Sequence, residues 1–218
     1  MSVYSIVVFI SGSGSNLQAL IEAQQSGVFQ AEISLVVSDR ADAYGLQRAL
    51  NSHIPSAYVP LPRSVDRLPA VRASIRADWE QRLLTVTNAF APDVIVLSGF
   101  MRVLSSTFLS GCTADIINQH PALLPDDSSD TFTTSTGAVI PTLRGAHVVQ
   151  DALAQQLPIT GCTVHRVTPI VDAGPVLARA EVPIVPEDTE TTLHERIKIE
   201  ERRLIVEVIK QLTQNSHI

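Results

Sequence analysis

The sequence of 218 residues lacks several features that mark whole classes of protein. It carries 16 Lys and Arg against 22 Asp and Glu, for a net charge of −6, without any block of like charges. A nucleic-acid partner normally requires a cluster of basic side chains, and none is present. The longest early apolar run, Ile6–Ile10, is far too short to span a bilayer, and no secretory signal precedes it. The composition therefore predicts a soluble protein that binds neither nucleic acid nor membrane.

Cysteine is also scarce. Cys112 and Cys162 are the only two, and their spacing fits neither a metal site nor a redox pair. We interpret them as buried thiols of a reducing compartment, which predicts a cytoplasmic protein. Repeats, a clear linker and a metal-ligand cluster are all lacking, so we expect a single metal-free domain over residues 1–218 with a core of ordinary size.

Buried apolar runs alternate with helical patterns along the chain. Strands are predicted at 4–10, 33–37, 54–59, 94–97, up to 117, 159–167 and 176–185. Helices are predicted at 17–23, 43–52, up to about 90, 145–156 and in a C-terminal segment capped by Thr192 with Glu195. The long helix before residue 90 can start at Asp66, with Pro69 in its first turn, or at Ser74. This alternation predicts an α/β fold with a mostly parallel twisted sheet and helices on both faces.

The first strand leads into a loop of Gly and Ser, residues 11–16, followed by a helix. This geometry aims free backbone N–H groups and a helix N-terminus at an anion, although a tight turn of small residues is the simpler reading. A dinucleotide fingerprint would have a third Gly near position 17, where Leu17 stands. Asp39 follows the next strand and could still serve as a ribose-binding acid. A nucleotide cofactor therefore stays open as an alternative.

Asn118 and His120 lie at the end of a predicted strand that Pro121 stops. Side chains alternate along a strand, so these two point to the same side and Gln119 to the other. An amide and an imidazole side by side can hold an oxygen that becomes negative during a reaction. They could equally cap a turn before Pro121, and these residues alone do not decide between the two.

Three further features have competing interpretations. Asp172 precedes Gly174-Pro175 and reads first as a turn former. His165, a lone histidine on a predicted strand, is interpreted as structural. The segment 126–141 is rich in Asp, Ser, Thr and Gly, so we expect it to bury little and to be a mobile insertion.

Taken together, these motifs resemble those of the glycinamide ribonucleotide formyltransferases, folate-dependent enzymes of purine synthesis. The matching stretches are residues 10–18, 93–104, 118–125, 161–165 and 172–177. They follow the family's order over nearly the whole chain. The resemblance implies a Rossmann-like formyltransferase fold. A phosphate-binding half, residues 1–100, is followed by a half, residues 101–218, that completes the sheet, with the active site between them.

The resemblance also implies a reaction. The formyl group of 10-formyltetrahydrofolate, a cosubstrate, would move to the amine of 5'-phosphoribosylglycinamide in de novo purine (IMP) biosynthesis. Asn118 and His120 would stabilise the tetrahedral intermediate, while Asp172 would assist proton transfer and raise the pKa of His120. A metal is not required.

Two binding sets follow from the same resemblance. The set for the ribonucleotide phosphate is Gly12, Ser13, Gly14, Ser15, Asn16, Lys198 and Glu201. The set for the folate is Arg76, Met101, Arg102, Val103, Leu104, Asn118, Thr168, Pro169, Ile170, Val171 and Asp172. Lys198 with Glu201 could instead be only a surface ion pair. The chain departs from the family in an insertion over most of 126–143 and in Gln119.

Rival functions share parts of this pattern. Formyltetrahydrofolate hydrolases usually carry an extra N-terminal domain, whereas Tyr4 here enters the first strand at once. Formylation of an aminoacyl-tRNA would require an additional RNA-binding domain and a basic surface. A nucleotide-binding Rossmann oxidoreductase is the alternative of another class, and Leu17 counts against it. The partners expected are small-molecule substrates, with a homodimer as a possible assembly.

Overall fold

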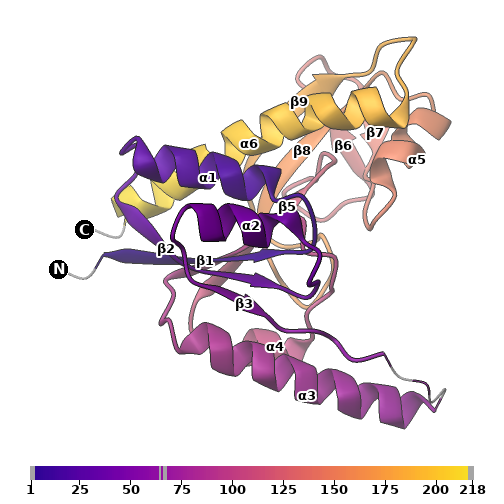
Figure 1. Cartoon of the computed structure of the whole chain (residues 1–218). Helices are drawn as coiled ribbons and strands as arrows, with labels where there is room; N and C mark the ends of the chain where they lie inside the picture. Colours follow the sequence, from indigo (N-terminus) through magenta and orange to yellow (C-terminus); the bar gives the residue numbers. More distant parts are fainter. Residues whose placement is uncertain (1–2, 64, 66–67, 216–218) are drawn as a thin grey trace. The chain divides into compact units, whose positions relative to one another are not determined.

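The computed structural model describes residues 3–63, 65 and 68–215 of the chain (Figure 1). It contains two compact units, residues 1–116 and residues 117–218. None of the helices in the described part of the chain is long and apolar enough to cross a membrane.

The first unit holds four parallel strands in the order β3-β2-β1-β4. They are β1 (Tyr4–Ile10), β2 (Ala31–Ser38), β3 (Ser56–Tyr58) and β4 (Val94–Leu97). All five side chains of Ile6–Ile10 are fully buried, as expected for a central strand covered on both faces. Figure 1 shows α1 (Ser15–Gln25) and α2 (Tyr44–Asn51) on one face of these strands. On the other face lie α3 (Pro69–Asn88) and α4 (Ser106–Gly111).

Two helices of this unit add to the sequence prediction: one settles an open choice of helix start, and the other was not predicted. Helix α3 begins at Pro69, which has no N–H to lose at a first helical position. The alternative start at Ser74 is therefore wrong, and the one at Asp66 lies outside the described residues. Helix α4 was not predicted because its 6 residues are too few to show a helical period. It is capped by Ser105, whose side chain accepts from the N–H of Phe108.

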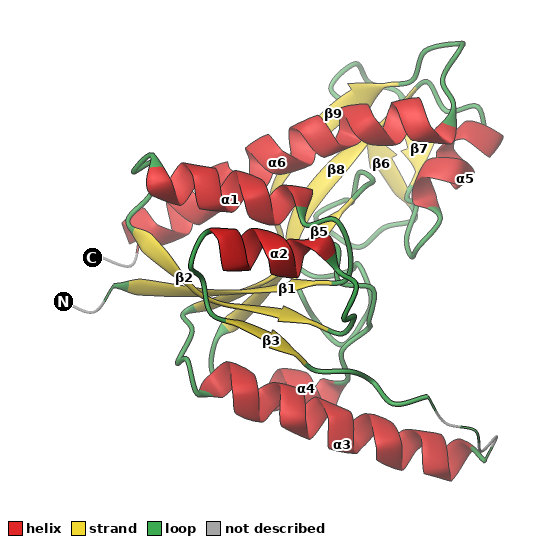
Figure 2. Cartoon of the chain, viewed as in Figure 1, coloured by secondary structure: helices red, strands yellow, loops and turns green. Residues whose placement is uncertain are grey.

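The second unit is antiparallel. Strand β5 (Asp115–His120) pairs with β8 (Ile159–Arg166), which pairs with β9 (Val176–Pro183). Helix α6 (Glu190–Asn215) packs on β8 and β9 and contacts the short α5 (Val148–Ala154). Figure 2 separates these helices, in red, from the strands, in yellow. The predicted α/β class is confirmed, with the parallel pairs in the first unit and antiparallel pairs in the second.

The predicted cap of the C-terminal helix is wrong by three residues. The helix begins at Glu190, and the capping pair is Thr189 with Thr192. The Thr189 hydroxyl accepts from the N–H of Thr192 at 3.2 Å, and the Thr192 hydroxyl accepts from the N–H of Thr189 at 2.9 Å. A second hydroxyl thus replaces the Glu of the usual reciprocal cap.

The expectation that residues 126–141 have little to bury is also wrong. The segment folds into an antiparallel hairpin of β6 (Thr131–Thr133) and β7 (Val139–Pro141). Phe132 and Ile140 are buried and form a cluster with Leu123 and Ile159. One apolar residue on each short strand suffices to anchor the hairpin, because Phe132 and Ile140 pack against the same neighbours. A count of composition does not reveal such an arrangement.

Candidate functional site

Strand β5 presents alternate side chains to opposite sides, as predicted. Asn118 and His120 pair with residues of the neighbouring strand β8, Asn118 opposite His165 and His120 opposite Thr163. Gln119 is buried on the other side and donates to the backbone carbonyl of Glu201 in α6 at 3.0 Å. The strand ends at His120, directly before Pro121.

Asp172 completes a group of side chains around His120. Its carboxylate lies 3.4 Å from Nδ1 of His120 and 3.6 Å from Nε2 of His165, and it accepts the N–H of Gly145 at 2.9 Å. Asn118 joins the group through His165, because its Nδ2 lies 3.2 Å from the same Nε2. The three residues predicted as catalytic are therefore brought together by the fold of the second unit.

His165 is the member of this group that sequence reasoning missed. Its Nδ1 lies 2.9 Å from the carbonyl of Arg166, which can only accept, so Nδ1 carries the hydrogen. Nε2 then lies between the Asn118 amide, 3.2 Å away, and the Asp172 carboxylate, 3.6 Å away. His165 is buried and links Asn118 to Asp172. Its position opposite Asn118 depends on the register between β5 and β8, which the sequence does not display.

The pKa of His120 is lowered from its ordinary value, because burial disfavours the imidazolium. Asp172 acts in the opposite direction, as predicted, but its charge does not outweigh the burial. The expected rise in the His120 pKa is therefore wrong, and the neutral imidazole prevails near neutral pH. Burial alone would raise the pKa of Asp172, but the His165 hydrogen bond, the His120 charge and the Gly145 N–H together hold it below its ordinary value.

One hydrogen of His120 is already engaged. Nε2 lies 2.8 Å from the backbone carbonyl of Leu143. A carbonyl accepts only, so Nε2 is the protonated nitrogen and Nδ1 faces Asp172. His120 in this conformation is a neutral hydrogen-bond donor. Its N–H can exchange the Leu143 carbonyl for a substrate oxygen as acceptor.

In the first unit, the Gly/Ser loop leads into α1 as predicted. Gly14 precedes the helix with φ 67°, and a Cβ on it would lie 2.7 Å from Cα of Gly45. Only glycine fits this left-handed position against a neighbouring backbone. Helix α1 has no side-chain cap at Gly14 and no acidic residue in its first turn. Its N-terminal N–H groups are thus left for an anion.

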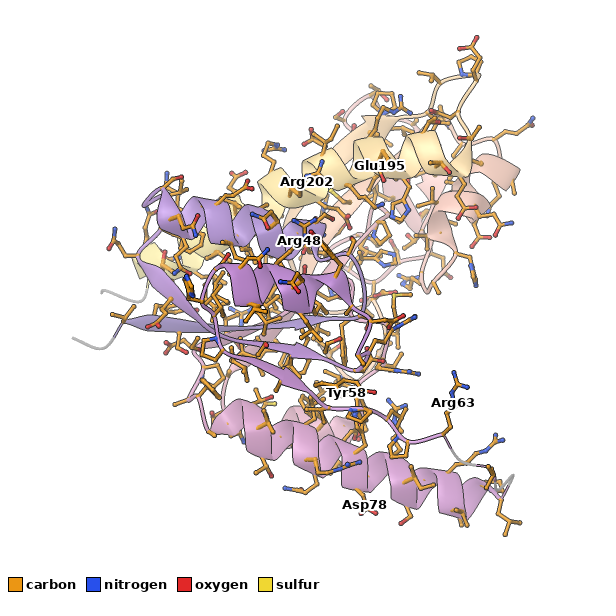
Figure 3. All side chains as sticks on the ribbon, viewed as in Figure 1. Arg48, Tyr58, Arg63, Asp78, Glu195 and Arg202 are labelled. Atoms are coloured by element: carbon orange, nitrogen blue, oxygen red, sulfur yellow. The ribbon has the colours of Figure 1, made fainter. Side chains whose placement is uncertain are left out.

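Arg48 is a second residue that sequence reasoning missed. It lies on α2, facing α1 (Figure 3), where Nε donates to the carbonyl of Ser13 at 2.9 Å and Nη1 to the side chain of Gln18 at 2.9 Å. A fixed positive charge therefore lies against the Gly/Ser loop. An arginine on an amphipathic helix gives no sequence signal for this role.

Asp39 has both carboxylate oxygens engaged. It accepts from the Ser11 hydroxyl at 2.6 Å and from Nε of Arg102 at 2.6 Å. The Ser11 hydroxyl in turn accepts the N–H of Met101 at 2.9 Å. Asp39 thus ties the Gly/Ser loop to the segment after β4, and its side chain is only 1% exposed, so a ribose cannot reach its oxygens. The nucleotide alternative loses the residue on which it depended.

The residues predicted for the folate fall into two groups. In the first unit, Arg76 donates to the carbonyl of Val103 and lies 3.4 Å from the carboxylate of Glu80. Met101 and Val103 are exposed, while Leu104 is buried. In the second unit, the loop of Thr168, Pro169, Ile170 and Val171 leads to Asp172, with Ile170 and Val171 exposed. Exposed apolar side chains on loops are available to a flat ligand.

Lys198 and Glu201 lie on α6. Lys198 pairs with Glu195, one turn earlier on the helix, at 2.7 Å, whereas the Glu201 side chain is buried. Lys198 therefore has the exposed ion pair that the simpler interpretation foresaw, though with another partner. In the described residues, no group of three or more His, Cys, Asp or Glu is placed to hold a metal ion.

Comparison with known proteins places this geometry in a family. Residues 4–209 match the formyl transferase family. The phosphoribosylglycinamide formyltransferase of Escherichia coli is 34% identical over 94% of this chain and 85% of its own length. The enzyme of that name from Mycobacterium tuberculosis is 36% identical over 95% of this chain and 84% of its own length.

Solved structures agree with the sequence comparison. Glycinamide ribonucleotide transformylase 1 from Symbiobacterium toebii superimposes with a TM-score of 0.81 at 33% identity, covering 98% of this chain and 89% of its own. The phosphoribosylglycinamide formyltransferase from Coxiella burnetii gives a TM-score of 0.80 at 36% identity over the same shares.

Proposed function

The chain belongs to the formyl transferase family, and we propose that it transfers the formyl group of 10-formyltetrahydrofolate to the amine of 5'-phosphoribosylglycinamide in de novo purine biosynthesis. The observation that carries this proposal is the likeness, over nearly the full chain, to enzymes named for that reaction. The clustering of Asn118, His120 and Asp172 supplies the chemistry.

In the proposed reaction the amine attacks the formyl carbon and negative charge develops on the formyl oxygen. Asn118 donates an amide N–H to that oxygen, and His120 donates the N–H that now meets the Leu143 carbonyl. Asp172, ionised because its pKa is low, accepts through water the proton that the amine loses. The proton then passes to the folate nitrogen released as the carbon–nitrogen bond breaks, so that charge and atoms balance.

Binding of the substrates is assigned to the predicted sets. The Gly/Ser loop, residues 12–16, supplies N–H groups for the phosphate, and Arg48 adds a positive charge beside it. In this proposal Lys198 leaves its ion pair with Glu195 to meet the phosphate, and the buried Glu201 stays assigned to the same set. The folate is assigned to Arg76, residues 101–104, Asn118 and residues 168–172. The exposed apolar side chains of Met101, Val103, Ile170 and Val171 suit a heteroaromatic ring.

The cytoplasm is the proposed place of action, and both thiols fit it. Both cysteines are free; Cys162 is buried as expected, whereas Cys112 is only half-buried. Burial raises the pKa of Cys112 to about 11 and that of Cys162 to about 12. Such thiols are not reactive at neutral pH. A homodimer remains a prediction.

The function is tested by following the tetrahydrofolate product spectroscopically, with and without 5'-phosphoribosylglycinamide. We expect product only when the ribonucleotide is present. The variant D172N removes the charge of Asp172 at nearly constant volume, and its turnover should fall by at least about a hundredfold. The control is D78N, a matched change at an exposed position on α3 (Figure 3), which should behave as wild type.

Two outcomes would contradict the proposal. Product formed at the same rate without the ribonucleotide would indicate hydrolysis of the formyl donor. Near-normal turnover of D172N, with a melting curve like that of wild type, would leave Asp172 as a turn residue only.

A further inference from the structure

The hairpin segment 126–143 is followed by Arg144, whose guanidinium reaches back across the base of the hairpin. Its Nη2 donates to the carbonyls of Ser128 at 3.0 Å and Ser129 at 2.9 Å. Its Nη1 lies 3.5 Å from the carboxylate of Asp130, which is itself fully exposed. The rigid fork of an arginine thus holds the start of the segment to its end.

The same side chain contacts the Asp172 loop. Nε of Arg144 donates to the backbone carbonyl of Asp172 at 3.4 Å. Two further hydrogen bonds reach the same loop. The hydroxyl of Ser128 donates to the carbonyl of Ala173 at 3.1 Å, and the N–H of Gly145 donates to the Asp172 carboxylate at 2.9 Å. Three hydrogen bonds therefore join the base of the hairpin to two consecutive residues.

The loop that receives these bonds needs an external support. Asp172 has φ 52°, in the left-handed region that non-glycine residues seldom occupy. Such conformations persist where surrounding contacts over-determine them. Gly174 adds a further restriction, because a Cβ there would lie 1.8 Å from the carbonyl oxygen of Arg166. The direction of the Asp172 carboxylate is thus set by its neighbours rather than by local preference.

We propose that Arg144 is a positioning residue of the formyl transfer reaction, which holds the Asp172 loop so that its carboxylate stays beside His120 and His165. This inference rests on the proposed role of Asp172. Arg144 is not assigned a contact with the amine or the formyl group. It acts through the backbone of Asp172 and through the base of the hairpin. The segment 126–143 is, on this view, part of the support of the catalytic group.

The pKa of His120 gives the proposal an independent readout. Five influences act on it: burial, His165 and Arg144 lower the pKa, while Asp172 and the hydrogen bond to the Leu143 carbonyl raise it. Displacement of the Asp172 carboxylate should therefore lower the His120 pKa, whereas loss of the guanidinium charge alone should raise it. A lysine at the same position would retain the charge but could not reproduce the fork of hydrogen bonds.

The experiment compares three variants of the full chain. R144Q loses both charge and fork, R144K loses the fork alone, and R179Q is the matched control. Arg179 also holds the segment, through Asp126 at 2.5 Å and the ring of Phe132, with its guanidinium carbon 5.3 Å from the ring centroid. None of its hydrogen bonds or ion pairs in the described structure is with Asp172 or Ala173. Turnover, both Michaelis constants and the His120 pKa by NMR are measured for each, beside a melting curve.

We expect turnover to fall by about tenfold or more in R144Q and R144K, the scale of a misplaced catalytic group, with both Michaelis constants changed by less than about threefold. The His120 pKa should fall in R144K, which keeps the positive charge but lets the Asp172 carboxylate move away from His120. R179Q should keep wild-type turnover whatever its melting temperature. Wild-type turnover in a folded R144Q, an equal loss in R179Q, or a His120 pKa in R144K that stays at the wild-type value would overturn the proposal. D172N separates this failure from that of the function: if D172N is inactive while R144Q is fully active, only the Arg144 inference falls.

Discussion

Asp172 shows how one residue can satisfy two interpretations that seemed to compete. Its backbone forms the turn before Gly174-Pro175 that the sequence predicts, at φ 52°. Its carboxylate nevertheless does not cap that turn; it accepts the N–H of Gly145 and faces His120 and His165. A turn former and a catalytic partner are therefore compatible at this position, because the backbone and the side chain are used for different purposes.

The lowered pKa of His120 makes stability depend on pH. Native His120 is neutral, whereas an unfolded histidine takes up a proton below its ordinary pKa of 6.5. The unfolded state then binds more protons than the native state, so the free energy of unfolding should fall as the pH is lowered below 6.5. We expect the variant H120Q, which cannot titrate, to lose less melting temperature between pH 7 and pH 5 than wild type does.

The comparison between wild type and H120Q isolates the contribution of His120 to the pH dependence of stability. His194 also has a lowered pKa, from burial first and from the charge of Lys198, but it is present in both. Asp172 contributes only at lower pH, since its stabilisation is lost below its own depressed pKa. Melting temperatures that fall in parallel for both proteins would show that the His120 pKa is not lowered by folding.

At the scale of elements, the hairpin of β6 and β7 is a small folded unit whose sequence resembles a disordered linker. Its core consists of Phe132 and Ile140 against Leu123 and Ile159. Polar anchors hold it to β9, where the N–H and hydroxyl of Ser135 both donate to the Glu181 carboxylate at 2.6 Å. A few directed contacts thus order a segment that is poor in apolar residues.

The anchoring of this hairpin is tested by F132A. Phe132 is 9% exposed, so its truncation should lower the free energy of unfolding by about 3 kcal/mol, the low end for a buried Phe changed to Ala. Amides of β6 and β7 should also exchange faster with solvent. V139A on the neighbouring strand is the control, because Val139 is 67% exposed and should change stability by less than about 0.5 kcal/mol. Rapid amide exchange of the hairpin already in wild type would support the mobile insertion first expected.

At the scale of the whole molecule, the boundary between the two compact units falls inside a strand. The first unit ends at residue 116 and the second starts at 117, whereas β5 runs from Asp115 to His120. Independent domains are usually joined by exposed, flexible linkers. The sequence prediction of a single domain over residues 1–218 therefore stays in place as a prediction that can be measured.

We expect one cooperative unfolding transition for the full chain. The chain passes from one unit to the other within a strand rather than through an exposed linker, which favours units that unfold together. Calorimetry checks this: the calorimetric and van't Hoff enthalpies should agree within error. Two resolved transitions, or a calorimetric enthalpy well above the van't Hoff value, would show that the units unfold independently.

The sequence by itself determined the features that depend on short-range patterns. Apolar runs and helical periods gave the α/β class, the alternation along β5 placed Asn118 and His120 on one side, and motif order identified the family. These succeed because backbone geometry fixes the period of the side chains locally.

Only the tertiary structure decided the features that depend on what lies opposite. His165 joins the proposed catalytic group through the register of β8 against β5, and Arg144 reaches Asp172 from 28 residues away. Burial, a property of the packed fold, reversed the expected shift of the His120 pKa. The hairpin was missed because two buried side chains and a few anchors contribute nothing to average composition, yet they suffice once neighbours from β8 and β9 are in place.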